Sequence, residues 1–520
     1  MSDLFSSQPI SADVPDHLPA AAPSDIDSSC RLPLFAIFLS AAVWLLIGSV
    51  FGLIASLKFH SPDFLANSAW LTYGRVRPAY LNCVLYGFCL QAGLGVALYV
   101  LARLGRTPLA QGWLVAVGVK IWNLGLAAGI LGILAGDSTA FENLEFPSYA
   151  AALLFLGYLL IGVWALFTFH QRRQHQLYVS QWFLLAALFW FPWIYSTANL
   201  LLTTFPVRGV VQAILGWWYS ENLIVVWLGL VGLATVFYFL PKLLDCTLHS
   251  HYLALLTFWM LILFASWGGI PASAPVPAWM PIISKVATIL TAVPIIAVLL
   301  NVYRTVWPPI GEGANATQGA PSQVSAAACT PRPQPSVKLR SPLLSSPSVS
   351  FILFGVAAFA LAGVMKIALA LSDVSQLQFT WFVSATKLLN SYGFFAMVMF
   401  GAIYCVLPRL TGIDFPRPRL VRAHFWLAAA GLTLVVLPQA IGGIVQSAQL
   451  ANARIPFSNV SHVMLHFLRI STVGDLLLLT GHLVFLGNVV GLVARFYRSR
   501  LEAAHARATI DLFPSAEVKL

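Results

Sequence analysis

Long apolar stretches constrain this chain more than any other feature of its sequence. A helix needs about 20 apolar residues to cross the hydrocarbon core of a bilayer, whereas a barrel strand needs only about 9–11. Twelve stretches reach the helical length, near residues 33–56, 79–103, 110–135, 147–169, 178–202, 209–240, 252–270, 281–303, 348–371, 380–407, 423–446 and 463–494. Because helices satisfy their own backbone hydrogen bonds, the sequence predicts an all-α membrane protein with twelve transmembrane helices.

Charged residues are scarce and unevenly placed along the chain. They make up 9% of its 520 residues, against about 25% in soluble domains, which excludes an ordinary soluble enzyme. If the N-terminus is cytoplasmic, 19 of the 29 lysines and arginines fall in cytoplasmic segments and five on the opposite side. The positive-inside rule then predicts a multi-pass protein with both termini in the cytoplasm. The net charge of +11 therefore indicates membrane orientation, and the expected partner is the lipid bilayer rather than nucleic acid.

The polar segments divide the chain into five parts. Residues 308–347 are rich in Pro, Ser and Ala, which is typical of a flexible loop. The first 31 residues have no basic region before an apolar run, so they do not resemble a cleaved signal peptide. The six cysteines show no CxxC spacing and indicate neither a zinc site nor a redox site. The expected parts are a polar cytoplasmic N-terminal tail (1–31), transmembrane helices 1–8 (32–307), the cytoplasmic loop (308–347), transmembrane helices 9–12 (348–497) and a cytoplasmic C-terminal tail (498–520).

Several strings near the ends of the apolar stretches resemble those of a known family. They are WLTYGRVRP at 70–78, GWWYSENL at 216–223 and SYGFFAMVMFGAIYCVLPRLTG at 391–412. The chain resembles subunit I of the haem-copper oxidases, and within that superfamily the cbb3-type cytochrome c oxidases, over about residues 65–500. The resemblance implies a bundle of twelve transmembrane helices in a bacterial inner (plasma) membrane, with other subunits of a respiratory complex as partners.

The same resemblance marks the positions at which the family holds its metals. In the family, histidines from the second, sixth, seventh and tenth helices ligate two haems and a copper ion. The second, sixth and tenth apolar stretches of this chain contain no histidine. The positions equivalent to the ligands are Tyr80, Glu221, Pro271, Ala272, Thr386 and Leu388. The resemblance therefore implies that neither haem nor copper is bound. The alternative is that Tyr80 ligates a haem, because tyrosine is a haem ligand in catalases.

Ionisable side chains inside the apolar stretches form a second group of candidate residues. A charge near the bilayer centre costs roughly 2.5–3.5 kcal/mol on insertion scales, so it usually has a partner. We expect Glu221 to pair with Lys387, and Lys120 to join this buried charge cluster; the alternative is that each lysine bonds to backbone carbonyls or water. Lys285 and Lys366 lie nearer to helix ends, so we expect their ammonium groups to snorkel to the membrane surface.

The last apolar stretch carries one further polar pair. Asp475 and His482 lie seven residues apart, which is close to two helical turns, so both side chains share one helix face. We therefore expect the Asp475 carboxylate to be the hydrogen-bonding partner of a core histidine.

These observations support three classes of function. The first is a non-catalytic or divergent paralogue, a pseudoenzyme that keeps the scaffold of subunit I without its haem and copper. The second is an active cytochrome oxidase or nitric oxide reductase subunit, which would bind haem b and copper through other ligands. The third is a proton-linked transporter that uses the intramembrane charges. The missing imidazoles favour the first class and leave open whether the chain is an enzyme.

Overall fold

The computed structural model describes residues 21–174, 176–307, 346–372 and 374–512, and every regular element among them is a helix. Eleven helical stretches in this part are long and apolar enough to cross a membrane. They are α1 (Pro23–Leu57), α2 and α3 (Tyr73–Asn82, Gln91–Gly105), α4 (Gly112–Ala135), α5 (Ser148–His170), α6 (Val179–Asn199), α7 and α8 (Val210–Glu221, Leu228–Leu243), α10 and α11 (Trp279–Leu290, Ala292–Val306), α13 (Pro347–Leu371), α14 and α15 (Trp381–Leu388, Met397–Thr411), α16 (Pro418–Leu450) and α17 (Phe457–Leu512). The remaining expected span, α9 (His251–Met260) with its extension to Ala265, is apolar but shorter. The all-α membrane bundle is confirmed, while eleven of the twelve expected helices reach the length of a full span.

Three stretches form the core of the bundle: α2 with α3, α7 with α8, and α14 with α15. Nearly all residues in their most apolar segments are buried, whereas fewer than half are buried in α4, α5 and α13. Apolarity alone does not set the core stretches apart, because α5 and α13 are about as apolar and yet less than half buried; the core stretches are the ones that neighbouring helices enclose. The core stretches correspond to the second, sixth and tenth apolar stretches of the sequence, on which most ligand-equivalent positions lie.

Each core stretch contains a segment of π-helix. The segments are Cys83–Leu90 between α2 and α3, Asn222–Trp227 between α7 and α8, and Leu389–Ala396 between α14 and α15. A π-helical turn departs from regular α-helical hydrogen bonding and frequently marks a functional site. Residues of all three segments line the cavities described below, so the irregular backbone lies beside the candidate site.

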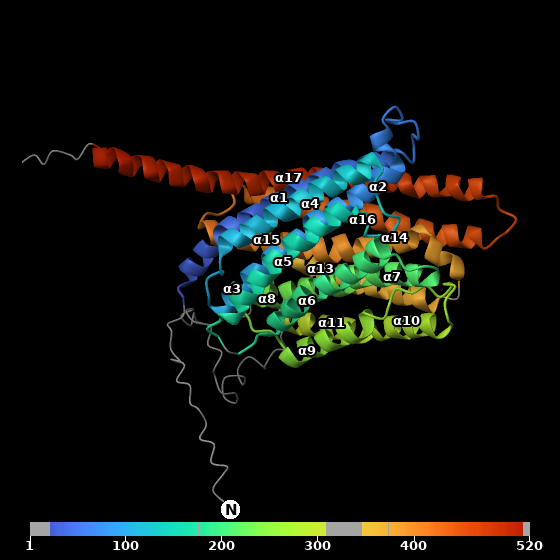
Figure 1. The fold of residues 1–520 in the computed structure, drawn as a ribbon, viewed down its shortest axis with the longest axis horizontal. Helices are drawn as coiled ribbons and strands as arrows, with labels where there is room; N and C mark the ends of the chain where they lie inside the picture. The colour runs from blue at the N-terminus through green and yellow to red at the C-terminus, as the bar shows by residue number, and fades with distance from the viewer. Residues whose placement is uncertain (1–20, 175, 308–345, 373, 513–520) are drawn as a thin grey trace, which may run out of the picture.

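The helices run roughly along one direction, and α2, α7 and α14 all begin at the same end of the bundle, here called the cavity end (Figure 1). The loop of residues 136–147 joins α4 to α5 and lies at this end as well. At the opposite end α17 continues past its neighbours and projects from the bundle (Figure 1).

The terminal helices differ from the expected boundaries. Helix α1 already begins at Pro23, inside the expected polar tail, because proline is favoured in the first turn of a helix. Helix α17 continues to Leu512, since Ala, Glu, Leu and Arg after its apolar part are good helix formers. Residues 1–20, 308–345 and 513–520, which hold the rest of the expected tails and loop, lie outside the described part.

Candidate functional site

Two cavities lie at the cavity end, and α14 contributes to both. Cavity 1 has a volume of about 120 Å³ and lies among α1, α2, α14, α16 and α17. Cavity 2 has a volume of about 380 Å³ and lies among α7, α10, α13 and α14. Leu388 lines cavity 1 and Thr386 lines cavity 2, because residues two apart on a helix point to different sides.

A buried ion pair stands on the wall of cavity 2. The Lys366 ammonium on α13 donates a hydrogen bond to the Glu221 carboxylate on α7. The two side chains are only 20% and 10% exposed, respectively. A Cβ on Gly269 would lie 2.7 Å from the Cβ of Glu221, and Gly269 has a φ of +95°. Glycine is needed here because any other residue would have a strained backbone and a Cβ that collides with the Glu221 side chain.

The expected pairing of Glu221 with Lys387 is wrong. Lys387 instead donates to both carboxylate oxygens of Glu142, at 2.7 and 2.6 Å. Lys366, expected to snorkel, takes Glu221 because it lies on the helix that faces α7 across the cavity. The Glu142–Lys387 pair is much more open, with side chains that are 53% and 36% exposed.

Lys120 does not join the charge cluster. It lies on an exposed face of α4, and no residue of that helix lines cavity 2. A lysine on an outer face can extend its apolar stem along the helix and carry its ammonium toward the membrane surface. Its charge therefore needs no buried carboxylate.

The six positions equivalent to the family's metal ligands divide between the two cavities. Tyr80 and Leu388 line cavity 1. The other four line cavity 2, namely Glu221, Pro271, Ala272 and Thr386. The register inferred from the strings thus brings each group of positions to a common space, although these residues lie far apart in the sequence.

The groups around the cavities do not fit haem iron or copper. Among the described residues that line cavity 1 or cavity 2 there is no histidine, cysteine or methionine. Imidazole, thiolate and thioether are common axial ligands of haem, and imidazole suits copper. Tyr80 supplies a phenol to cavity 1, but the volume of that cavity is below the roughly 300–1,000 Å³ of typical ligand pockets. Nowhere do the described residues bring together three or more His, Cys, Asp or Glu side chains able to hold a metal.

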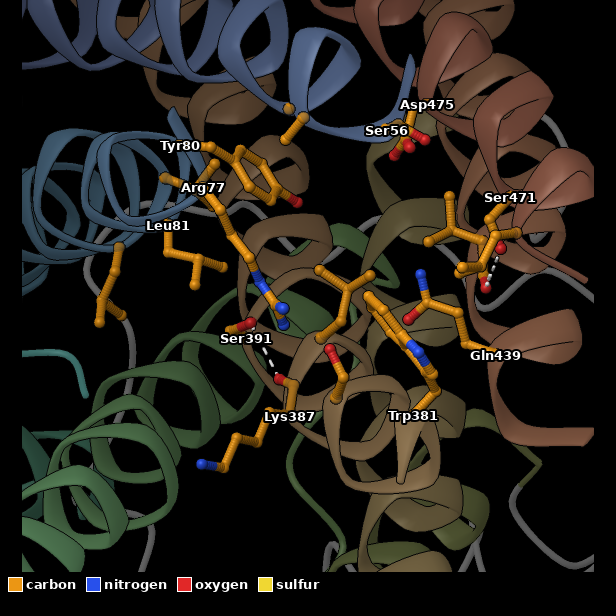
Figure 2. A pocket seen from close by; sticks show the side chains of 18 of the residues that line it. Ser56, Arg77, Tyr80, Leu81, Trp381, Lys387, Ser391, Gln439, Ser471 and Asp475 are labelled. Carbon is orange, nitrogen blue, oxygen red and sulfur yellow. Dashed lines mark hydrogen bonds between the residues drawn. The ribbon is translucent and has the colours of Figure 1, made fainter. Parts of the chain in front are cut away.

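Aromatic and polar side chains form the wall of cavity 1. Arg77 lies over the Trp381 ring, 5.1 Å from its centroid, and donates to the Tyr73 hydroxyl at 2.8 Å. Figure 2 shows Arg77 and Trp381 across the cavity from Asp475, which lies beside Ser56. The ring and the hydroxyl hold the guanidinium in place through a cation–π contact and a hydrogen bond.

The expected hydrogen bond between Asp475 and His482 is wrong. Two helical turns separate them by roughly 10 Å along α17, which is too far for direct contact. The His482 ring lies between the hydroxyls of Ser49 and Tyr392, which meet Nδ1 and Nε2 respectively. Asp475 has Ser56 as its neighbour instead. His482 therefore belongs to a buried network that joins α1, α17 and the third π-helical segment.

The loop between α4 and α5 carries site residues that the sequence did not reveal. Beside Glu142, Asn143 donates to the Ser220 hydroxyl at 2.7 Å, and Asn82 donates to the Glu145 carboxylate at 2.9 Å. Burial raises the pKa of Glu145 to about 7, although the Asn82 amide and two backbone N–H groups favour its ionised form. The loop therefore links α2 and α7 beside both cavities. The sequence signal that could have indicated this loop is its two glutamates, because the whole chain has only 18 acidic residues.

Comparison with known proteins identifies the family. The family described as Cytochrome C and Quinol oxidase polypeptide I matches residues 33–477. This chain belongs to that family. The match includes all three core stretches and every residue that lines the two cavities, so the resemblance to subunit I of the haem-copper oxidases is confirmed.

Individual relatives in the family agree with this assignment. The chain is 25% identical over 479 residues to a cytochrome c oxidase subunit 1 homolog of Azorhizobium caulinodans, covering 88% of this chain and 81% of the relative. It is 24% identical over 416 residues to the cbb3-type cytochrome c oxidase subunit CcoN1 of Stutzerimonas stutzeri, covering 78% and 81%. The cryo-EM structure of a haem-copper terminal oxidase dimer shares the fold, with a TM-score of 0.66, 13% identity and coverage of 89% of this chain and 84% of that chain.

Proposed function

We propose that this chain is a non-catalytic paralogue of cbb3-type subunit I that keeps the helical scaffold of the family without haem or copper. The observation that carries the proposal is the lining of the two cavities in which the ligand-equivalent positions gather. Among the described residues, that lining offers carboxylates, ammonium groups and hydroxyls in place of imidazoles. The protein then has a structural or regulatory role in the respiratory membrane.

The Glu221–Lys366 pair is the strongest support, because its chemistry opposes metal binding. A metal ligand must offer a lone pair, whereas a protonated lysine has only donors. The Glu221 carboxylate already accepts from that ammonium, and a cation in the same space would be repelled by it. The pair therefore balances charge at a ligand-equivalent position without a metal.

An active oxidase subunit is the second candidate, and Tyr80 is the observation that favours it. Its side chain lines cavity 1 at the position equivalent to a haem ligand. Phenolate ligation of haem iron is known from catalases. In that case haem b and copper are bound, and the protein takes part in electron transfer from cytochrome c to oxygen.

A proton-linked transporter is the third candidate, because the ionisable groups gather around the cavities. Transport requires a polar path that continues to the opposite end of the bundle. One or two turns beyond the cavities, Phe400 packs against Phe88 and Phe485, with ring centroids 4.9 and 4.8 Å away. All three rings are fully buried. The buried His424 ring lies 4.6 and 5.1 Å from the Phe400 and Phe485 rings, so these phenylalanines narrow a polar path without forming a continuous apolar layer.

We also propose an orientation in the bacterial plasma membrane with both termini cytoplasmic and the cavity end outside. The distribution of lysine and arginine supports it. Under this orientation both cavities lie in the extracytoplasmic half of the membrane, and other subunits of a respiratory complex are the expected partners.

Haem and metal content tests the proposal. The full chain and the Stutzerimonas stutzeri relative are purified from the same host, and reduced-minus-oxidised spectra are recorded together with iron and copper analysis. We expect neither haem b nor copper in this chain. Stoichiometric haem b with copper would overturn the proposal, and loss of that haem in Tyr80→Phe but not in Tyr73→Phe would establish the second candidate. Proton flux in liposomes, measured on the metal-free protein, would favour the transporter.

A further inference from the structure

Cavity 2 has the size and the lining of a ligand pocket. Its volume of about 380 Å³ falls within the roughly 300–1,000 Å³ of small-molecule sites. A cavity of about 150 Å³ holds benzene, so cavity 2 has room for an apolar body roughly twice as large. The apolar side chains that line it include Ile224, Leu261, Ile295, Phe359 and Leu369.

The charges around cavity 2 do not balance. Three lysines and two glutamates line it, and the two carboxylates are already engaged by Lys366 and Lys387. The third ammonium, on Lys285 of α10, has no hydrogen bond or ion pair among the residues that the structure describes. An unpaired charge beside apolar walls is costly, and an anion would satisfy it.

Hydroxyl groups flank Lys285 on the same helix. Ser284 and Thr288, one residue before and three after, also line cavity 2, and both are buried. The Ser284 oxygen accepts from the Ile270 backbone N–H at 3.0 Å, which leaves its own proton for another acceptor. One ammonium and two hydroxyls on adjoining positions of a helix therefore suit a carboxylate, which accepts hydrogen bonds at both oxygens.

We propose that cavity 2 binds a medium-chain monocarboxylate, with its carboxylate on Lys285 and its hydrocarbon chain against the apolar wall. Lys285 has no carboxylate partner within the described part of the chain, so the site calls for one negative charge, and the apolar lining calls for a chain rather than a polyol or a second acid. The exposed Glu142–Lys387 pair at the edge of the cavity is the expected entrance. This inference rests on the proposal that cavity 2 holds neither haem nor copper.

Equilibrium binding of radiolabelled octanoate to the purified full chain tests it, with Lys285→Met as the decisive variant. We expect unlabelled octanoate to compete, and octanol, octylammonium and acetate at the same concentration not to compete, because each lacks either the anion or the chain. Loss of a charged hydrogen-bond partner should weaken binding about tenfold or more. Lys120→Met removes an exposed membrane lysine and should bind like the unchanged protein, as should Lys285→Arg.

Equal binding of octanol and octanoate would overturn the inference, as would unchanged binding by Lys285→Met. Haem and copper are measured on the same samples. If both metals are present in stoichiometric amount, the proposed function fails and the inference with it. If both are absent and octanoate still does not bind, only the carboxylate site is wrong.

Discussion

The two cavities share α14 and one end of the bundle, yet their walls differ in chemistry. Cavity 2, about 380 Å³, has two lysine–glutamate pairs on its wall. Cavity 1, about 120 Å³, is lined by aromatic rings and by Arg77, and the hydrogen-bonded network of His482 surrounds a smaller neighbouring cavity that shares Tyr80 and Asp475 with it. The lysine–glutamate pairs of cavity 2 join neighbouring helices and leave the volume between them open. The bulky aromatic rings of cavity 1 fill most of the volume between its helices.

This difference predicts unequal sensitivity to substitution. A neutral hydrogen bond contributes about 0.5–1.5 kcal/mol net, whereas removing one partner of a buried ion pair costs about 3–5 kcal/mol. Cavity 2 should therefore depend on one buried pair, while the stability around cavity 1 is spread over several weaker contacts.

The largest expected effect is that of Glu221→Gln. It leaves the Lys366 ammonium buried and unpaired, so we expect a loss of about 3–5 kcal/mol in the free energy of unfolding. The double variant Glu221→Gln/Lys366→Met should recover most of this loss because no lone charge remains. Thermal unfolding of the detergent-solubilised protein measures both. If Glu221→Gln costs no more than Glu142→Gln, cavity 2 does not depend on the buried pair.

Glu145→Gln tests the loop that links the two cavities. The pKa of Glu145 is raised to about 7 in the folded protein, so the folded state binds its proton more tightly than the unfolded chain. Its contribution to stability is full below about pH 4.5, falls as the pH rises to about 7 and is constant above that value. The variant should lack this fall and be more stable than the unchanged protein at pH 8, by about 3 kcal/mol.

The pH profile of unfolding, recorded from pH 4.5 to 8, checks this prediction. Glu142→Gln, which changes an exposed carboxylate of the same loop, should still show the fall that Glu145 causes. Parallel profiles for the unchanged protein and Glu145→Gln would mean that Glu145 is not held in a buried site.

His482→Leu tests the network beside cavity 1. It leaves the Tyr392 hydroxyl without its partner, while the Ser49 hydroxyl keeps its hydrogen bond to the Leu45 carbonyl, and a buried unsatisfied group of this kind costs about 1–3 kcal/mol. We expect a loss of about 2 kcal/mol by thermal unfolding. Asp475→Asn, two turns away on the same helix, should leave the network intact. If His482→Leu leaves the stability unchanged while Asp475→Asn lowers it, the stabilising contact is made by Asp475 and not by His482.

The fold was largely predictable because its signals are local. The length of an apolar stretch decides whether a helix can span the bilayer. Which helices lie inside the bundle is decided by packing, because α5 and α13 are about as apolar as α7 with α8 and yet less than half buried. The exception is α9, whose apolar stretch extends beyond the helix that forms. The regular structure ends at Ala265, and Gly268 and Gly269, the latter with a φ of +95°, follow within four residues and do not continue the helix.

The site was predictable in kind but not in its pairing. Glu221 and Lys387 do have partners, as the cost of an intramembrane charge required. Their identity depends on how neighbouring helices are rotated and on a loop that brings Glu142 to α14, and neither is encoded in spacing along one helix. Lys120 shows the same limit, since its helix turns it away from the bundle.

Lys387→Met provides the smallest expected effect and the sharpest contrast with Glu221→Gln. Both glutamates pair with a lysine at cavity 2, and the two pairs differ in exposure. Glu142→Gln removes the same type of partner as Glu221→Gln and is the matched control. An exposed pair contributes about 0.2–1 kcal/mol and is screened by salt, whose Debye length falls to about 3 Å at 1 M. The loss in Lys387→Met should therefore be below about 1 kcal/mol and should vanish at 1 M salt, while that of Glu221→Gln persists because burial excludes the ions. If Lys387→Met and Glu221→Gln lose the same stability, both at low salt and at 1 M salt, the two pairs are equally buried. The contrast between a buried pair inside cavity 2 and an exposed pair at its entrance would then be wrong.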